Sequence, residues 1–213
     1  MNSGTSILLM KRALLITASM LALSMPMAAH ATIEVGGVKI EETAKVGNAQ
    51  LKLNGAGIRK KVFVNVYVAA LYLGEKKATP ADVMALAGPK RIQLTMLRDV
   101  TSDTMGQSFM DGLNHNSTKV EKTKIVNQMQ KFGEMFASIP ELKKGDVVAV
   151  EWVPNVGSLT TLNGKPTAEP FPDVAFFNAL LRIWIGDNPA YAPLKNQMLG
   201  VSEKAASDSR KEN

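Results

Sequence analysis

Arg59 and Tyr67 are two residues of this 213-residue sequence whose types and spacing could hold a carboxylate. A guanidinium pairs with a carboxylate through two parallel hydrogen bonds, and a phenol hydroxyl can add a third donor. Both residues lie in segment 58–73, which is rich in Val, Phe and Tyr, as strands are. In one regular strand they would share a face with Phe63 and Asn65, because side chains alternate along a strand. The pattern fits a carboxylate site, and the alternative is a strand-edge Arg paired with an acid beside a core Tyr.

Other catalytic and metal-binding patterns are missing from the sequence. It contains no Cys, which excludes disulfides, thiolate metal sites and a Cys nucleophile. His115 is the one histidine after position 31, so a zinc site, which normally needs several His or Cys ligands, is not expected. No Gly-x-Ser-x-Gly elbow accompanies it, and the Gly55-Ala56-Gly57 segment lacks the spacing of a dinucleotide-binding loop. We therefore expect no metal and no cofactor.

The N-terminus has the three parts of a secretory signal peptide. A basic pair precedes the almost entirely apolar residues 13–27, and Ala29 and Ala31 are small residues at the two positions that a signal peptidase reads. The apolar run is shorter than the roughly 20 residues that a membrane-spanning helix needs. We expect residues 1–31 to be a signal peptide, the mature protein to be periplasmic, and no stable membrane span to remain after cleavage. An uncleaved membrane anchor is the alternative.

The expected mature domain, residues 32–200, is long enough for one domain with its own core. Residues 201–213 are small, polar and charged, which is typical of a flexible tail. The whole chain has a formal charge of +6, which falls to +4 without the two basic residues of the signal. The remaining basic residues are mixed with acidic ones, as in 119–124, and this indicates solvated helix faces. Nucleic acid is therefore not an expected partner, and the sequence identifies no protein partner.

Hydrophobic periodicity predicts strands first, then helices, then a hairpin and more helices. After Val62, segment 58–73 is largely apolar at odd and even positions alike, so we predict a strand that is covered on both faces. The other predicted strands form a hairpin at 33–40, single strands at 50–54 and 91–97, and a second hairpin at 146–153 and 158–163. The predicted helices start at Thr79-Pro80, 101, 119, 173 and 192, and the second of them carries Met105 and Phe109 on one apolar stripe. This order predicts an α+β fold in which an antiparallel sheet carries helices on one face.

The order of several motifs resembles the chalcone isomerase superfamily. They are the Leu53–Arg59 segment with its Gly-x-Gly-x-Arg, the strand through Val66–Leu73, the long paired helices at 101–138, and Trp184-Ile185-Gly186 followed by Leu194-Lys195. The likeness covers nearly all of residues 32–200 and is nearer to the exported bacterial branch and the fatty-acid-binding members than to true chalcone isomerases. It implies an open-faced β-sandwich, in which a large antiparallel sheet is covered by a layer of helices with a ligand cleft between them.

The resemblance also implies what the site lacks. True chalcone isomerases carry an Arg, a Thr on the following strand, a Tyr and an Asn on a helix, and a Ser or Thr on a late helix. Arg59 matches the Arg. The other four positions fall at or near Tyr67, Met105, Gly112 and Ile183. Without those hydroxyls and the amide the site cannot orient a polyphenol, so chalcone isomerase activity is not expected.

An Arg followed by a Tyr is closer to the fatty-acid-binding pattern within that superfamily. We therefore predict a non-catalytic periplasmic protein that binds a fatty acid or a similar apolar carboxylate in a cleft between sheet and helices. Arg59 and Tyr67 would hold the head group, and the other predicted ligand-binding residues are Asn65, Phe63, Met105, Phe109 and Ile183. Two alternatives remain open: an intramolecular lyase or isomerase on an unknown substrate, and an envelope scaffold that binds a protein partner through an exposed apolar patch.

Overall fold

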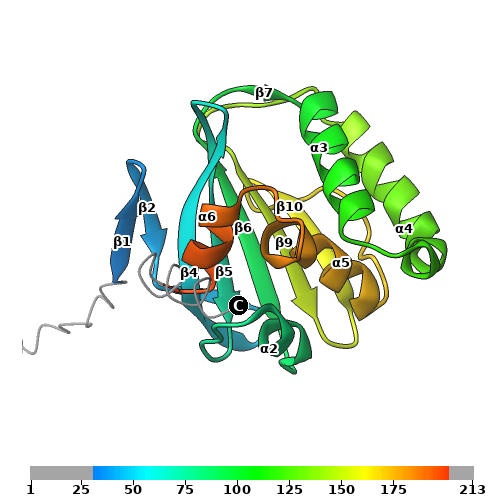
Figure 1. Ribbon diagram of the computed structural model, residues 1–213, viewed down its shortest axis with the longest axis horizontal. Helices are drawn as coiled ribbons and strands as arrows, with labels where there is room; N and C mark the ends of the chain where they lie inside the picture. The colour runs from blue at the N-terminus through cyan, green and yellow to red at the C-terminus, as the bar shows by residue number, and fades with distance from the viewer. Residues whose placement is uncertain (1–30, 202–213) are drawn as a thin grey trace, which may run out of the picture.

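A curled antiparallel sheet is the frame of the described part of the molecule, residues 31–201 of a computed structural model (Figure 1). The predicted signal peptide, 1–31, and the predicted tail, 201–213, lie outside the described residues except for the single residue at which each meets the domain. The strands are β1 (Thr32–Val35), β2 (Val38–Glu41), β3 (Thr43–Val46), β4 (Ala49–Lys61), β5 (Val64–Leu73), β6 (Lys90–Met96), β7 (Val100–Thr101), β8 (Glu141–Leu142), β9 (Val147–Val153), β10 (Gly157–Leu162) and β11 (Lys165–Pro166). The helices are α2 (Pro80–Ala85), α3 (Ser102–His115), α4 (Lys119–Ala137), α5 (Val174–Ile185) and α6 (Ala192–Met198).

The large sheet has seven strands in the order β11-β10-β9-β6-β5-β4-β3, and every neighbouring pair is antiparallel. The chain lays down β3 to β6 in sequence, adds the α3–α4 pair, and returns to pair β9 with β6. Figure 1 shows α3, α4 and α5 together on one side of the sheet, with α6 lying over β4. The predicted α+β fold with an antiparallel sheet and a helical layer is confirmed.

Strand β5 is buried on both faces, as its apolar sequence predicted. Ala69 and Leu71 face the helices and belong to the main core. Val68 and Tyr72 face the other way and pack in a second cluster with Ile40 of the β1–β2 hairpin. The Tyr72 hydroxyl donates a hydrogen bond of 3.0 Å to the backbone oxygen of Glu41, which ties that hairpin to the sheet. The helical layer and the hairpin together leave β5 without a solvated face from Tyr67 to Leu73.

The predicted single strand over 58–73 is wrong, because the chain reverses in its middle. Strand β4 ends at Lys61, and β5 begins at Val64, so Val62 and Phe63 form a two-residue turn. Neither residue is a turn former, and Val62 adopts a positive φ of 56°, a conformation that β-branched residues rarely take. The turn therefore contains no turn-forming residue, and its sequence predicts a continuous strand.

Two glycines of β4 let helix α6 lie directly on the sheet. A Cβ atom added to Gly55 would meet the backbone oxygen of Gln197 at 2.1 Å, and one added to Gly57 would meet the Gln197 side chain at 1.9 Å. The neighbouring Asn54 donates to the backbone oxygen of Met198 at 2.8 Å and so anchors the end of the helix. The Gly-x-Gly segment is thus a site of close backbone approach, where the C-terminal end of α6 packs on the middle of β4.

Helix α3 begins at its predicted cap and presents an apolar stripe to the sheet. The Thr101 hydroxyl accepts a hydrogen bond of 3.3 Å from the backbone N–H of Thr104. One turn and two turns further on, Met105 and Phe109 are buried. The Phe109 ring packs edge-on against Trp184 of α5, with the ring centroids 5.5 Å apart. This contact fixes α3 against α5, the two helices that carry most of the site described below.

Lys90, the first residue of β6, is an unusual member of the interior. It is 2% exposed and shares its strand face with Ile92 and Leu94, which belong to the main core. No carboxylate within residues 31–201 forms an ion pair with its ammonium, and burial lowers its pKa from the ordinary 10.5. The protonated form is therefore less favourable in the folded protein than in the unfolded chain.

We expect Lys90→Met to raise the free energy of unfolding by about 1–2 kcal/mol at neutral pH, because Met keeps the stem and removes the poorly solvated charge. At pH values between the lowered pKa of Lys90 in the folded protein and its ordinary pKa of 10.5, the unfolded chain binds more protons than the folded protein. The free energy of unfolding of the wild type should therefore rise with pH in this range, and that of Lys90→Met should not. Urea unfolding at several pH values measures both effects. Lys52→Met, on an exposed position of β4, is the control and should change stability little. Equal or lower stability of Lys90→Met would contradict this interpretation.

Candidate functional site

A cleft of about 910 Å³ lies between the turn end of the β4–β5 hairpin and helices α3 and α5. The loop before α3 and the loop after α5 complete its walls, and its size is within the roughly 300–1,000 Å³ usual for small-molecule sites. Its apolar wall is formed by Val66, Val100, Met105, Phe109, Ile183 and Trp184. Its polar lining includes Arg59 and Tyr67 from the sheet, Arg98 and Asp99 from the loop before α3, and Asp111 and His115 from α3. The cleft thus has an apolar wall beside a polar one, which suits an amphipathic ligand.

Arg59 and Tyr67 lie directly opposite each other on neighbouring strands. A bulge in the β4–β5 pairing moves the register by one residue, so Arg59 faces Tyr67 whereas Lys60 faces Asn65. Residues that are directly opposite share a face of the sheet, and here that face lines the cleft. The bulge therefore places the guanidinium and the phenol side by side.

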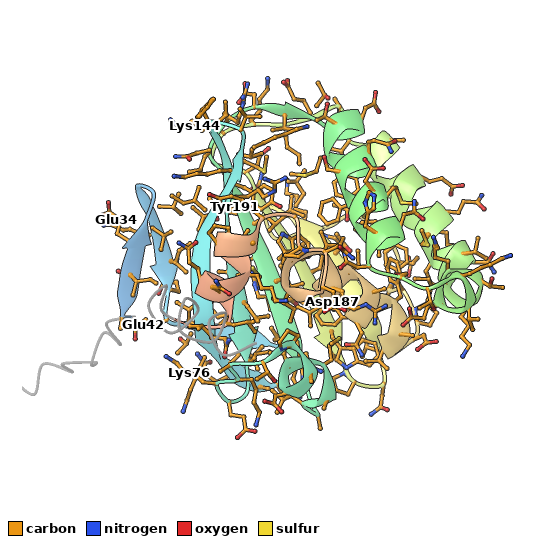
Figure 2. All side chains as sticks on the ribbon, in the orientation of Figure 1. Glu34, Glu42, Lys76, Lys144, Asp187 and Tyr191 are labelled. Atoms are coloured by element: carbon orange, nitrogen blue, oxygen red, sulfur yellow. The ribbon has the colours of Figure 1, made fainter. Side chains whose placement is uncertain are left out.

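The guanidinium of Arg59 is half-buried and has no acidic partner within residues 31–201. One of its nitrogens donates to the backbone oxygen of Lys60. Its carbon lies 6.0 Å from the ring centroid of Tyr191, a cation–π distance, at the residue that precedes α6 (labelled in Figure 2). The ring holds the guanidinium in place without neutralising it, so its positive charge is available to a ligand.

The Tyr67 hydroxyl is buried, and it donates its hydrogen to no acceptor within residues 31–201. The indole N–H of Trp184 donates to it at 3.0 Å, which uses one acceptor position of the oxygen. Burial raises the pKa of Tyr67 above its ordinary value of 10.0, although the Trp184 hydrogen bond and the Arg59 charge both act against this. The phenol is therefore neutral at physiological pH. Trp and Arg side chains can only donate, so neither can accept the hydroxyl hydrogen of Tyr67.

The structure brings together most of the predicted site residues. Arg59, Tyr67, Met105, Phe109 and Ile183 all line this one cleft, although their roles toward a ligand remain predictions. Phe63 and Asn65 do not line it. Phe63 is in the unrecognised turn and is 95% exposed. Asn65 is exposed at the start of β5, and the bulge between it and Tyr67 breaks the alternation that would have given the two side chains one face.

Sequence reasoning missed two aromatic residues that shape the polar end of the cleft. Trp184 was noted only as part of a motif, and its hydrogen bond to Tyr67 joins residues 117 positions apart in the chain. Tyr191 lies in the loop before α6, and only the close packing of α6 on β4 brings it to Arg59. Neither contact has a local sequence signal. The one available hint was the composition of the C-terminal third, where both tryptophans and one of three tyrosines occur.

Two general properties of residues 31–201 bear on the class of site. No three His, Cys, Asp or Glu side chains come together there in a way that could hold a metal ion. No helix of that part of the chain is long and apolar enough to cross a bilayer.

Comparison with known proteins agrees with this architecture. A family model described as chalcone isomerase-like matches residues 31–200. The chain belongs to the chalcone isomerase-like family. Among solved structures, it is similar to a fatty-acid binding protein of Arabidopsis thaliana, with a TM-score of 0.64 and 14% sequence identity over 83% of this chain and 98% of that one. At that identity the likeness shows the fold alone. No curated protein matches the sequence.

Within this chalcone isomerase-like protein, the positions matched to isomerase residues meet in one place. The cleft is lined by Arg59, Tyr67, Met105, Gly112 and Ile183. Three of these carry no polar side-chain group, so the amide and two hydroxyls of the isomerase pattern are absent from those positions. Gly112 and Ile183 are also in close contact, since a Cβ added to Gly112 would lie 2.8 Å from Cγ2 of Ile183. The space that an Asn would need at 112 is occupied by the isoleucine.

Proposed function

We propose that this protein binds a fatty acid or a similar apolar carboxylate in the cleft, with the head group at Arg59 and Tyr67, and does not isomerise chalcones. The observation that carries the proposal is that Arg59 and Tyr67 lie opposite each other in the cleft and form no hydrogen bond or ion pair with Asp99 or Asp111, the two carboxylates among the lining residues within 31–201. Arg59 has no acidic partner within residues 31–201, and the Tyr67 hydroxyl accepts from Trp184, which leaves the hydroxyl hydrogen for a ligand. An ionised carboxylate is acceptor-only and fits this arrangement.

The strength of such binding would come from charge-assisted hydrogen bonds in a partly dry site. Each hydrogen bond to a charged group contributes about 1.5–3 kcal/mol, more than a neutral pair. Arg59 can offer two parallel N–H groups, and the neutral Tyr67 can add its O–H. A neutral ester or alcohol could not draw on the guanidinium charge in the same way.

The rest of the cleft supports an apolar ligand body. Met105, Phe109 and Ile183 come from two helices and form a continuous apolar wall beside the head-group site. Methionine adapts to ligands of different shape because its side chain is unbranched and has three rotatable bonds. A flexible hydrocarbon chain is a suitable occupant of a wall of this kind.

The proposed location is the periplasm. The support is the basic, apolar and small-residue pattern over residues 1–31. Expression of the full chain with an epitope at its C-terminus, followed by cell fractionation and N-terminal sequencing of the product, tests this proposal.

The ligand proposal is tested with delipidated protein and three ligands of equal chain length: myristate, methyl myristate and tetradecanol. Isothermal titration in the absence of vesicles or detergent should give saturable one-to-one binding of myristate, at least about ten-fold tighter than either neutral analogue. Native mass spectra of the protein as purified should contain an added mass that organic extraction identifies as an acid. Equal affinity for the three ligands would remove Arg59 and Tyr67 from the head-group role. Absence of binding to all three would refute the carrier function.

A further inference from the structure

The turn of the β4–β5 hairpin exposes three consecutive large apolar side chains. Val62, Phe63 and Val64 are 81%, 95% and 42% exposed, and we call them the hairpin tip. The other exposed large apolar side chains of residues 31–201 are separate from one another in sequence. Single exposed apolar residues are ordinary, but a run of three at the end of a projecting hairpin needs a physical reason.

Folding does not supply that reason. Two-residue hairpin turns favour Asn, Asp or Gly, because at least one turn residue takes a positive φ. Here that residue is Val62, with φ 56°, and the side chain that follows it is almost fully exposed to water. Strain at Val62 and the exposure of three apolar side chains both oppose the folded state. The tip is therefore suited to something outside the domain.

Basic side chains surround the tip. Lys60 and Lys61 precede the tip in the chain. Arg98 is held near the same hairpin, because the backbone N–H of the preceding Leu97 donates to the backbone oxygen of Val66 at 2.9 Å. The turn that holds Lys144 is tied to the same end of β6, and Figure 2 labels Lys144 at the end of the molecule where Figure 1 shows this hairpin turning. The three segments 59–61, 98–99 and 141–146 carry six basic and three acidic side chains.

The acidic side chains at this end are already engaged. Asp99 accepts from the ammonium of Lys143 at 3.4 Å and from the backbone N–H of Lys144 at 2.7 Å, and Glu141 pairs with the same Lys143. Lys60, Lys61, Arg98 and Lys144 have no ion-pair partner within residues 31–201. The surface around the tip consequently carries a net positive charge around an apolar centre.

We propose that the hairpin tip inserts into the surface of an anionic lipid bilayer. The apolar side chains would enter the boundary between head groups and acyl chains, and the long basic side chains would stay among the lipid phosphates. A protein partner is less suitable, because a stable protein interface buries about 800 Å² on each side and a convex turn with three side chains offers far less. The docking would be peripheral and would depend on ionic strength.

The tip is continuous with the cleft. Lys61, Val62 and Val64 line the cleft as well as forming or flanking the tip, so a docked molecule would hold one wall of the cleft at the lipid surface. An apolar ligand could then pass between bilayer and cleft with little exposure to water. This inference goes beyond the ligand-binding proposal and does not rest on it, since docking can be measured without a ligand.

The experiment is cosedimentation of the delipidated mature protein with vesicles of phosphatidylcholine, alone or mixed with phosphatidylglycerol. We expect partition to the mixed vesicles at least about ten-fold stronger than to phosphatidylcholine, and weakened by added salt. Phe63→Ser should reduce partition about ten-fold, and Lys60→Gln with Lys61→Gln about twenty-five-fold, since each lysine near an anionic surface contributes about five-fold. Phe63 does not line the cleft, so Phe63→Ser should bind myristate in vesicle-free titration as the wild type does.

Three outcomes would overturn the proposal. The wild type would fail to sediment with either vesicle, or Phe63→Ser would sediment as well as the wild type. The third is tip-dependent self-association or cross-linking to another protein without any vesicle binding, which would assign the tip to a protein partner. Because the vesicle assay contains no added fatty acid and the titration contains no vesicles, failure of docking and failure of ligand binding are separate results.

Discussion

Replacing Arg59 with Gln is expected to weaken myristate binding by about 100-fold, because it removes two charge-assisted hydrogen bonds from a partly buried site. The loss should appear for myristate and be small for methyl myristate, which has no charge to pair. Isothermal titration of delipidated protein measures both affinities. Arg59→Lys keeps the charge but not the planar pair of N–H groups, so we expect an intermediate loss of about ten-fold.

Lys60→Gln is the matched control for this prediction. It removes the same charge from the adjacent residue, which is exposed and does not line the cleft, and it should change myristate affinity little. If the two variants weaken binding equally, the effect of Arg59 is general electrostatic attraction and no specific pair forms. If Arg59→Gln binds myristate like the wild type, the head group lies elsewhere. Thermal unfolding of each variant checks that loss of the Tyr191 contact has not unfolded the α6 region.

Local sequence signals predicted the elements that position the site. The Thr79 and Thr101 caps are where the sequence placed them, and each hydroxyl accepts from the backbone N–H three residues later. The predicted hairpin at 33–40 is β1–β2, in which Ile33 pairs with Ile40 around two glycines of positive φ. Such features depend on neighbours in the chain, and this is why a single sequence is enough to find them.

The β4–β5 turn could not be predicted for the same physical reason. Its residues, Val62 and Phe63, favour strands, so the local signal opposes the observed conformation. The single-strand interpretation still paired Arg59 with Tyr67, because eight residues around a two-residue turn and a one-residue bulge also bring them opposite each other. It gave the wrong face to Phe63, which is in the turn, and to Asn65, which the bulge before Tyr67 places away from the cleft.

The polar end of the site depends on contacts that no local pattern encodes. Trp184 reaches Tyr67 because α5 crosses the sheet at this point, and Tyr191 reaches Arg59 because glycines 55 and 57 admit α6. The sequence therefore predicted the two residues that would touch a carboxylate but not those that hold them. The availability of the Tyr67 hydrogen became evident only with Trp184 in place, since the indole N–H donates to the hydroxyl oxygen and cannot accept from it.

The contact between Gly112 and Ile183 leads to the second large prediction. Gly112→Asn should lower the free energy of unfolding by about 2–3 kcal/mol, because the added side chain overlaps Cγ2 of Ile183 in a packed α3–α5 interface. Gly133→Asn on α4 is the control, since nothing lies within 4 Å of the Cβ that it would add. There the change removes a glycine from a helix and should be neutral or slightly stabilising. Urea unfolding of both variants provides the comparison, and equal effects at the two sites would contradict the overlap.

A double-mutant cycle with Ile183→Ser shows whether these two positions are coupled. Serine has no Cγ2, so the pair Gly112→Asn with Ile183→Ser should be more stable than the sum of the single changes by about 1–2 kcal/mol. Additive effects would mean that the Asn finds room without displacing the isoleucine. Coupling would mean that the amide and the late hydroxyl of the isomerase pattern can enter this cleft only together. Either residue introduced alone would disturb the helix packing that also holds Trp184 against Tyr67, and with it the donor arrangement on which carboxylate binding depends.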